Sequence, residues 1–333
     1  MTAVEYPIDE SDRSEVAPCP LGYPAGRWLI KELHPELSPP SGKDLEIEQR
    51  VLRTVSLVGE RGYGLTLKKL SKGLIGGPVG IDKVRSAVEG SRKVSFDGTF
   101  VCAPGRGSTV KCHARRRSDR KLRRAYMRIA RDYAEELSKL CPWVECVLVS
   151  GSVASGGIAV GDDLDFDIIA KDGTKFITYL FALALGLKYA IKNRALFKDR
   201  YFGFLPKVIC VNVVWERRQV LPFERQDEQV AYELMVSKVL YNRPFYSMMI
   251  GRNLWLKDYF PQLLKRSEGA PLLIDGKDGK ASAKRPRLMN LLASKVLQSM
   301  YQVVRLSRKN ELDKLHRMEF VEARKRPYGL FDD

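Results

Sequence analysis

Hydrophobic residues recur along this chain at two different spacings, and each spacing predicts a different kind of element. Spacings of three and four residues predict helices over residues 44–59, 66–74 and 81–88. Continuous β-branched and apolar runs predict strands over Val144–Val149, Asp163–Ala170 and Lys207–Glu216. Because helices and strands both occur, we expect a fold of the α+β class.

The first three helices are followed by a strong hairpin pattern. The segment VSFDGTFVCAP places two β-prone runs around Asp97-Gly98, which favours a tight turn. Three helices and a hairpin within residues 43–110 predict a winged helix-turn-helix. Such a unit places its later helix in a DNA groove, and here that helix carries Lys83 and Arg85. A unit used only for packing or dimerisation is the alternative.

The next segment, residues 111–141, predicts one long amphipathic helix with a strongly basic first half. Leu122, Tyr126, Ile129 and Tyr133 form its apolar face. Its basic residues include Arg115, Arg116, Arg117, Arg120, Lys121 and Arg124, and Asp119 is the acidic residue among them. A one-signed charge run of this kind favours contact with a polyanion, although a solvated face is the alternative. The charge does not distinguish DNA from RNA.

Further helices are predicted beyond the first strands. Their ranges are Thr174–Ala190, part of Gln226–Tyr241, Phe245–Tyr259 and Arg287–Ser307. The domain organisation that we expect is an irregular extension over 1–42, a winged-helix-like domain over 43–110, a basic linking helix over 111–141, a core over 142–222, and a helical region with a basic loop and tail over 223–333.

Charge and composition narrow the partners. The 333 residues include 57 Lys+Arg against 40 Asp+Glu, a formal net charge of +17, which favours a nucleic-acid partner. The longest apolar run, Phe176–Leu187, is shorter than the ~20 residues that span a bilayer. We expect a cytoplasmic protein without a membrane partner. The six cysteines form no CxxC pair and predict buried, reduced thiols.

The candidate chemistry lies in Val147–Lys171. The apolar run ends at Gly151-Ser152, and three carboxylates, Asp163, Asp165 and Asp167, then alternate with apolar residues. Alternate residues of a strand share one face, and oxygen ligands grouped in this way suit Mg²⁺ or Mn²⁺. The turn offers backbone N–H groups and a hydroxyl to phosphate oxygens. A metal site next to a phosphate site indicates a nucleotide.

These residues resemble the DNA polymerase β-type nucleotidyltransferase superfamily, whose pattern is hG[GS], a spacer and Dh[DE]h. The later segments KVICVNVVWE and YELMVSKVLYNRPFYSMMIGRNLWLKDYFP resemble a prokaryotic branch that has an N-terminal winged-helix-like region. The similarity runs from about residue 45 to 262. It implies a small mixed β-sheet flanked by helices, preceded by the winged helix-turn-helix and followed by a helical region.

The resemblance also implies roles for individual residues. Gly151 and Ser152 would hold the β- and γ-phosphates of a nucleoside triphosphate, and Asp163 and Asp165 would bind the metal ions of a two-metal displacement. Lys171, just past the second strand, is a further candidate for contact with the triphosphate.

One departure from the family concerns its third carboxylate, whose position is occupied here by Asn212. An amide ligates metal weakly and does not accept a proton as a carboxylate does. Asp167 and Glu216, which alternation places on the faces of Asp165 and Asn212 respectively, are two possible replacements. A solvated strand end is the alternative interpretation of Asp167.

The sequence thus predicts a Mg²⁺-dependent transferase that moves a nucleoside monophosphate from a nucleoside triphosphate to a hydroxyl. The implied acceptor is an RNA end; a protein side chain and a small molecule stay open. The alternative is a non-catalytic nucleic-acid-binding regulator that keeps the nucleotidyltransferase fold. A component of a toxin–antitoxin pair is a third hypothesis, which the sequence does not test.

Overall fold

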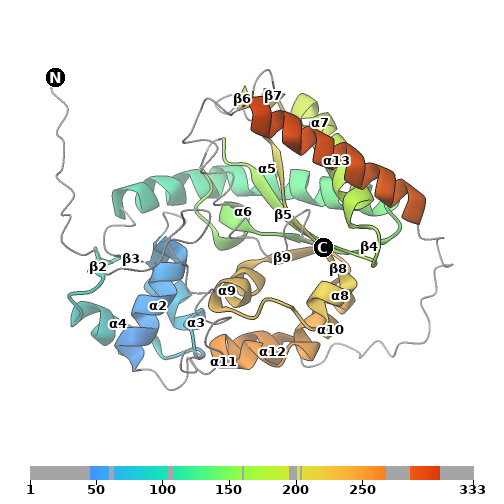
Figure 1. The fold of residues 1–333 in the computed structure, drawn as a ribbon. Coiled ribbons are helices and arrows are strands. Elements are labelled where there is room, and N and C mark those ends of the chain that lie inside the picture. Colours follow the sequence, from blue (N-terminus) through green and yellow to red (C-terminus); the bar gives the residue numbers. More distant parts are fainter. Residues whose placement is uncertain are drawn as a thin grey trace, which may run out of the picture. The chain divides into compact units, whose positions relative to one another are not determined.

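The computed structural model describes residues 46–59, 64–103, 109–159, 161–194, 201–202, 205–267 and 286–307 (Figure 1). Within these ranges, the side chains of residues 118–121, 201–206 and 266–267 are not described. The predictions for the extension over 1–42 and for the tail beyond Ser307 lie outside the described residues.

The N-terminal helices and hairpin are present where the sequence predicts them. They are α2 (Ile47–Gly59), β1 (Leu65–Thr66), α3 (Leu67–Lys72), α4 (Ile81–Glu89), β2 (Ser95–Phe96) and β3 (Phe100–Cys102). The three strands form an antiparallel sheet in the order β1-β3-β2. The hairpin turn is stabilised by Asp97, whose Oδ1 accepts hydrogen bonds from the backbone N–H groups of Thr99 and Phe100 at 2.9 and 2.8 Å.

The predicted basic helix is α5 (Thr109–Leu140), a single helix of 32 residues. Tyr126, Tyr133 and Leu137 are fully buried along one side of it. Because these positions are separated by seven and four residues, they share one helical face, as the sequence pattern requires. The polar and basic residues occupy the other side.

A mixed four-stranded sheet lies at the centre of the described structure. Its strands are β4 (Val144–Val149), β5 (Leu164–Ala170), β8 (Ile209–Glu216) and β9 (Lys238–Tyr241), in the order β8-β5-β4-β9. β5 runs parallel to β8 and antiparallel to β4. A parallel pair needs a crossover, and α7 (Lys175–Lys192) lies between the two strands in the chain. The α+β class is therefore confirmed.

Helices cover both faces of this sheet (Figure 1). On one face, α5 and α7 pack on Leu164, Phe166 and Ile168. On the other, Leu148 and Ile169 belong to the core that contains residues of α2, α3 and the helices from 228 onward. The remaining helices are α6 (Gly151–Ser155), α8 (Arg217–Val220), α9 (Glu228–Val236), α10 (Arg243–Arg252), α11 (Leu256–Tyr259), α12 (Pro261–Ser267) and α13 (Arg287–Ser307).

Two strand regions were not predicted. Residues 226–241 were expected to bear a helix, but that helix, α9, ends at Val236 and the chain continues as β9, which pairs with β4. A second pair, β6 (Tyr201–Phe202) and β7 (Leu205–Pro206), forms a separate two-stranded sheet. In the described part of the chain, no helix is both long and apolar enough to cross a membrane.

A buried side chain, Asn253, joins the segments after β8 to the helices after β9. Its Oδ1 accepts from the Phe223 N–H at 2.8 Å and from Trp255 Nε1 at 2.9 Å. Its Nδ2 donates to the carbonyls of Val220 and Met249 at 2.9 and 2.8 Å. Because Asn253 is fully buried, water does not reach these groups to replace its hydrogen bonds.

We predict that Asn253→Ala lowers the free energy of unfolding by about 3 kcal/mol, because buried backbone groups lose their partners. Urea denaturation measures the change. Asn193→Ala, at the half-buried C-terminal end of α7, is the control and should cost under about 1 kcal/mol. Equal losses in the two variants would show that the Asn253 bonds do not stabilise the fold.

Candidate functional site

The turn after β4 fits closely against the carboxylate of Asp165. Gly151 has φ +62°, and a Cβ placed there would lie 1.9 Å from Asp165 Oδ2. The Ser150 N–H also donates to the Asp165 backbone carbonyl at 2.9 Å. A side chain at residue 151 is therefore excluded both by the backbone conformation and by the carboxylate. The structure brings together the glycine turn and the acidic strand that the sequence singled out.

Asp163 and Asp165 belong to one cluster with a thiol. Their carboxylate oxygens and Cys210 Sγ all lie within 4.8 Å of one another. Cys210 is opposite Asp165 in the parallel β5–β8 register. Lys207, which precedes β8, forms an ion pair with Asp163, with Nζ 2.6 Å from Oδ2. The sequence interpretation missed both Lys207 and Cys210 as site residues, since the β5–β8 register that brings them here is not a local property.

The electrostatics of this cluster favour a cation. Burial, and then the neighbouring Asp163 carboxylate, raises the pKa of Asp165 to about 6, against a partial opposing effect of Lys207 and Cys210. Two carboxylates held this close repel unless positive charge lies between them. Their hard oxygen atoms fit Mg²⁺ or Mn²⁺, whereas the Cys210 thiol suits softer ions. The donor set therefore fits a divalent cation held by the two carboxylates.

Asp167 lies deeper on the same strand and is fully buried. Burial, followed by the nearby charge of Glu233, holds its pKa well above the usual range, although hydrogen bonding from Asn212 acts in the opposite direction. Burial and the Glu233 charge both favour the protonated form of Asp167. The alternative interpretation of Asp167 as a solvated strand end is wrong. Its Oδ2 and the Ser150 Oγ are both buried without a hydrogen bond of ordinary geometry.

Asn212 occupies a bulge rather than a regular strand position. The β5–β8 register passes from Phe166↔Val211 to Asp167↔Val213, so Asn212 is the extra residue. Its Nδ2 donates to Asp167 Oδ1 at 2.9 Å and to Glu233 Oε1 at 3.4 Å. Asn212 therefore links the carboxyl group on β5 to a carboxylate on α9.

The bulge also removes Glu216 as a replacement for the third carboxylate. Alternation without a bulge places Glu216 on the face of Asn212, but the observed register pairs it with Ala170, whose side chain packs on the α5–α7 side. Glu216 instead accepts from the Gly173 N–H at 2.9 Å and pairs with Arg218 at 3.1 Å. Glu233, which the sequence analysis did not select, is the additional carboxylate near the site.

Of the two other predicted nucleotide-binding residues, Ser152 lies at the glycine turn and Lys171 does not. Ser152 is buried in the first turn after Gly151. Lys171 follows the far end of β5, six residues beyond Asp165, which corresponds to about 20 Å of strand. The structure does not bring Lys171 to the carboxylates; the lysine that reaches them is Lys207.

The predicted nucleic-acid-binding residues occupy α4 and α5. Arg117 and Arg124 are exposed, and Arg116 is exposed with its guanidinium 5.9 Å from the Phe100 ring centroid. Lys83 and Arg85 are exposed on α4, where Arg85 pairs with Glu89 at 3.7 Å. Arg120 and Lys121 lie within α5, and their side chains are outside the described set.

The loop between α6 and β5 is attached to α5 and α3. Arg115 contacts the Gly157 carbonyl at 3.4 Å and Asp162 at 3.5 Å. Lys69 Nζ donates to the Ser155 carbonyl at 2.6 Å, and the Tyr126 hydroxyl accepts from the Gly161 N–H at 3.2 Å. These contacts position the loop that joins the glycine turn to Asp163.

Comparisons of the chain with protein-family models, with curated proteins and with solved structures give no match. The geometry of the site itself therefore carries the functional interpretation.

We predict that Asp165→Asn raises the free energy of unfolding of the metal-free protein at pH 8, by up to about 3 kcal/mol. The folded-state pKa of Asp165 is raised to about 6 from a usual value of 3.8, so its protonation stabilises the fold at low pH and that stabilisation is lost as pH rises through 6. The difference in the free energy of unfolding between the variant and wild type should be about 1.4 kcal/mol smaller at pH 5 than at pH 8, because wild-type Asp165 is mostly protonated at pH 5.

Denaturation at both pH values in EDTA measures this difference. Asp132→Asn, an exposed position on α5, is the control and should show no such dependence. An Asp165→Asn variant that is less stable than wild type by the same margin at pH 5 and pH 8 would show that the ionised Asp165 carboxylate does not destabilise the fold.

Proposed function

We propose that this protein is a metal-dependent nucleotidyltransferase that moves a nucleoside monophosphate from a nucleoside triphosphate to a hydroxyl acceptor. The observation that carries the proposal is the close fit of the Gly151 turn against Asp165, with Asp163 beside it. A backbone turn that offers N–H groups and a carboxylate pair that favours a cation are the two parts needed to hold a triphosphate.

The order of elements supports the same proposal. A strand, a glycine turn, an acidic strand, a helix and a third strand follow one another as β4, α6, β5, α7 and β8. This is the order of the nucleotidyltransferase superfamily that the sequence resembles. The helices α2, α3 and α4 with their three-stranded sheet support a winged helix-turn-helix in front of that core.

In this proposal Asp163 and Asp165 hold Mg²⁺ or Mn²⁺, and Gly151 and Ser152 face the β- and γ-phosphates. The bound metal would neutralise charge on the carboxylates and on the phosphate oxygens. Lys207, whose side chain is 48 % exposed, provides a further positive charge beside the same carboxylates. A cation held by Asp163 would replace the positive charge of Lys207 there, and the Lys207 ammonium could then contact phosphate.

We assign the proton-accepting role to Glu233 rather than to Asp167. Asp167 is fully buried and already accepts a hydrogen bond from Asn212, so it is not placed to take a proton from a substrate, and the Asn212 amide lacks a basic oxygen. Glu233 is half-buried, and its charge acts on Asp165. Asp167 acts behind Asp165, as a buried group that orients Asn212.

A non-catalytic regulator is the second candidate function. Two observations favour it, the amide of Asn212 at the position of the third carboxylate and the ion pair that already neutralises Asp163. In that case the same turn would sense a nucleotide, and α4 and α5 would bind nucleic acid without chemistry.

We predict pyrophosphate release from at least one nucleoside triphosphate in Mg²⁺ or Mn²⁺, with a loss of at least about 100-fold in Asp163→Asn and Asp165→Asn. Asp172→Asn, past the far end of β5, is the matched control and should keep wild-type turnover. Labelled nucleotide identifies the acceptor among RNA ends, the protein itself and small molecules.

Two outcomes would contradict the transferase. Absent turnover with all four nucleotides and both metals, by a folded protein that binds nucleic acid, favours the regulator. Equal turnover in wild type and in both aspartate variants would remove these residues from the site.

For Glu233 we predict that Glu233→Gln slows turnover by about 10- to 1000-fold while nucleotide affinity changes little, because the proton acceptor is lost and the triphosphate contacts are kept. Single-turnover kinetics and equilibrium binding separate the two. Normal turnover in Glu233→Gln would show that Glu233 is not the proton acceptor.

A further inference from the structure

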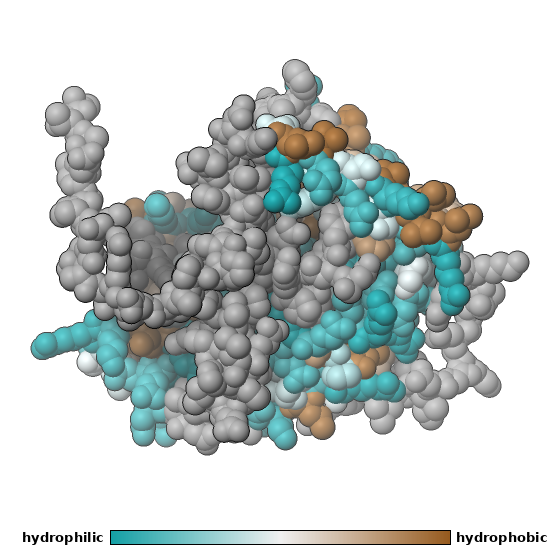
Figure 2. All heavy atoms as spheres, in the orientation of Figure 1, coloured by the Kyte–Doolittle hydropathy of each residue, from teal (hydrophilic) through white to brown (hydrophobic). Residues whose placement is uncertain are grey.

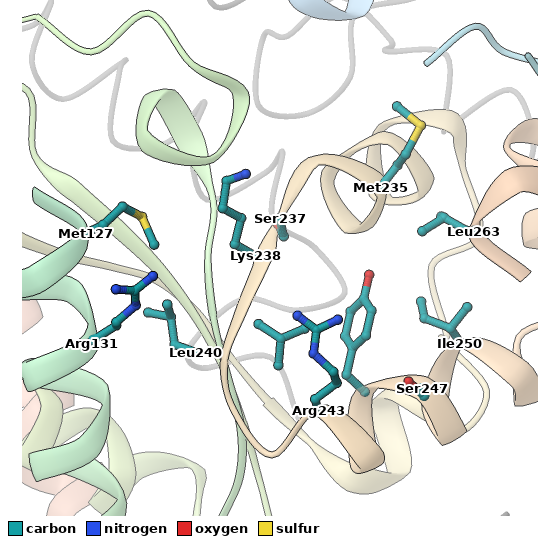
Figure 3. Close-up of a pocket in the computed structure, with 12 residues that line it drawn as sticks. Met127, Arg131, Met235, Ser237, Lys238, Leu240, Arg243, Ser247, Ile250 and Leu263 are labelled. Atoms are coloured by element: carbon teal, nitrogen blue, oxygen red, sulfur yellow. The ribbon is translucent and has the colours of Figure 1, made fainter. Parts of the chain in front are cut away.

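A concave site lies at the β9 edge of the central sheet. It is a cavity of about 360 Å³ formed by α5, β9, α10 and the ends of α9 and α12 (Figure 3). The cavity lies on the β9 side of the sheet, whereas Asp163 and Cys210 are at β5 and β8. The site is therefore separate from the carboxylate cluster.

Three cationic side chains line this cavity, Arg131 from α5, Lys238 from β9 and Arg243 from α10. No carboxylate is among the described residues that line it. Neither Arg131 nor Arg243 forms an ion pair with the described residues, and both are exposed. Like charges gathered in a concave surface raise the local potential and attract an anion. The charge of the cavity thus fits phosphate.

The rest of the wall is apolar or carries hydroxyl groups. Met127 and Leu240 lie beside Arg131, and Ile250 and Leu263 lie on the opposite side in Figure 3. Methionine and leucine side chains adapt to a flat ring, and Ser247 offers a hydroxyl. A ligand with an anionic group and a flat apolar group, which is the chemistry of a nucleotide, matches both kinds of wall.

The cavity begins next to the glycine turn. In the β4–β9 ladder Lys238 pairs with Val149, the last residue of β4 before Ser150 and Gly151. A ligand seated against Lys238 is thus held beside the first turn of α6, on the edge of the sheet.

A row of arginines on α5 leads to the same cavity. Arg117, Arg124, Arg128 and Arg131 are exposed, and spacings of seven, four and three residues place them on one face of the helix. Because Arg131 both ends this row and lines the cavity, a phosphate backbone that follows α5 enters it. A volume of about 360 Å³ is at the lower end of small-ligand pockets and admits a single nucleotide but no duplex.

We propose that this cavity binds one nucleotide of a single-stranded nucleic acid, with the adjoining strand along the α5 arginine row. The statement that this strand supplies the hydroxyl acceptor rests on the proposed nucleotidyltransferase function. The binding itself does not, because Arg131 and Arg243 lie outside the carboxylate cluster. Recognition would combine phosphate contacts along a positively charged groove, as single-strand binding does in general, with contact of the base on the apolar wall.

Fluorescence anisotropy with a labelled 12-nucleotide single strand tests the proposal, in EDTA so that metal chemistry plays no part. The double variant Arg131→Gln/Arg243→Gln should bind at least about 10-fold more weakly at low salt. The slope of log affinity against log salt should fall by about 1.4, since each lost phosphate contact on a single strand removes about 0.7. The double variant Arg287→Gln/Lys295→Gln on α13, with the same charge change at exposed positions, should bind as wild type does.

Several outcomes would overturn the proposal. These are wild-type affinity in the Arg131/Arg243 double variant, an equal loss in the α13 control, and a duplex that binds as tightly with the same dependence on Arg131. A free mononucleotide that binds with the same dependence on Arg131 but does not displace the strand would assign the cavity to a small ligand instead. The Arg131→Gln single variant, with an expected loss of about threefold, provides a second test if the double variant melts early.

Asp163→Asn separates this proposal from the proposed function, because it should bind the strand like wild type while losing turnover. Strand binding with no turnover in any variant leaves the cavity assigned and rejects the transferase. Turnover in a protein whose strand binding does not depend on Arg131 would support the transferase and reject the cavity as the strand-binding site.

Discussion

The site depends on one physical constraint, the repulsion among carboxyl groups placed on one face of a buried strand. Asp163, Asp165 and Asp167 alternate with core residues of β5, so the strand cannot turn them to solvent without exposing Phe166 and Ile168. The structure meets the repulsion in more than one way. Lys207 pairs with Asp163, and burial raises the pKa of Asp165 and, further along the strand, the pKa of Asp167.

The surrounding elements follow from this constraint. Only glycine fits at residue 151, because the turn passes directly over the Asp165 carboxylate. The bulge in β8 turns the Asn212 amide toward Asp167 and Glu233, and the amide donates a hydrogen bond to one carboxyl oxygen of each. The cluster therefore combines two neighbouring carboxylates with a backbone turn, and in the proposed function a cation would relieve the repulsion between those carboxylates.

Local patterns in the sequence predicted most of the elements. The periodicity of α5, the β-branched runs of β4, β5 and β8, and the Gly151 turn next to the aspartates are properties of neighbouring residues. The side chains that complete the site are determined by register. A bulge of one residue moved Glu216 to the opposite face, and the pairing of β5 with β8 selected Lys207 and Cys210 while it left Lys171 at the far end. Glu233 comes from α9, a helix that lies far from β5 in the chain.

The same limit applies to β9 and the cavity beside it. Lys238–Tyr241 is a short β-prone run directly after a helix, and nothing local indicates that it pairs with β4. Arg131 stood in the predicted basic helix, but Arg243 lies more than a hundred residues away and meets it only across β9. Charge at one end of a helix indicated a polyanion, and the tertiary structure shows where a concave cationic surface forms.

The central claim is that Asp163 and Asp165 gather a divalent cation against a triphosphate seated on the Gly151 turn. The most direct measurement is a crystal structure with Mn²⁺ and a non-hydrolysable nucleoside triphosphate, using the anomalous signal of manganese to place the ion. The account predicts a manganese peak within ligand distance of both carboxylates, phosphates over Gly151 and Ser152, and Lys207 moved away from Asp163. Manganese absent from the carboxylates, with Lys207 still paired to Asp163 and the nucleotide bound elsewhere, would contradict it.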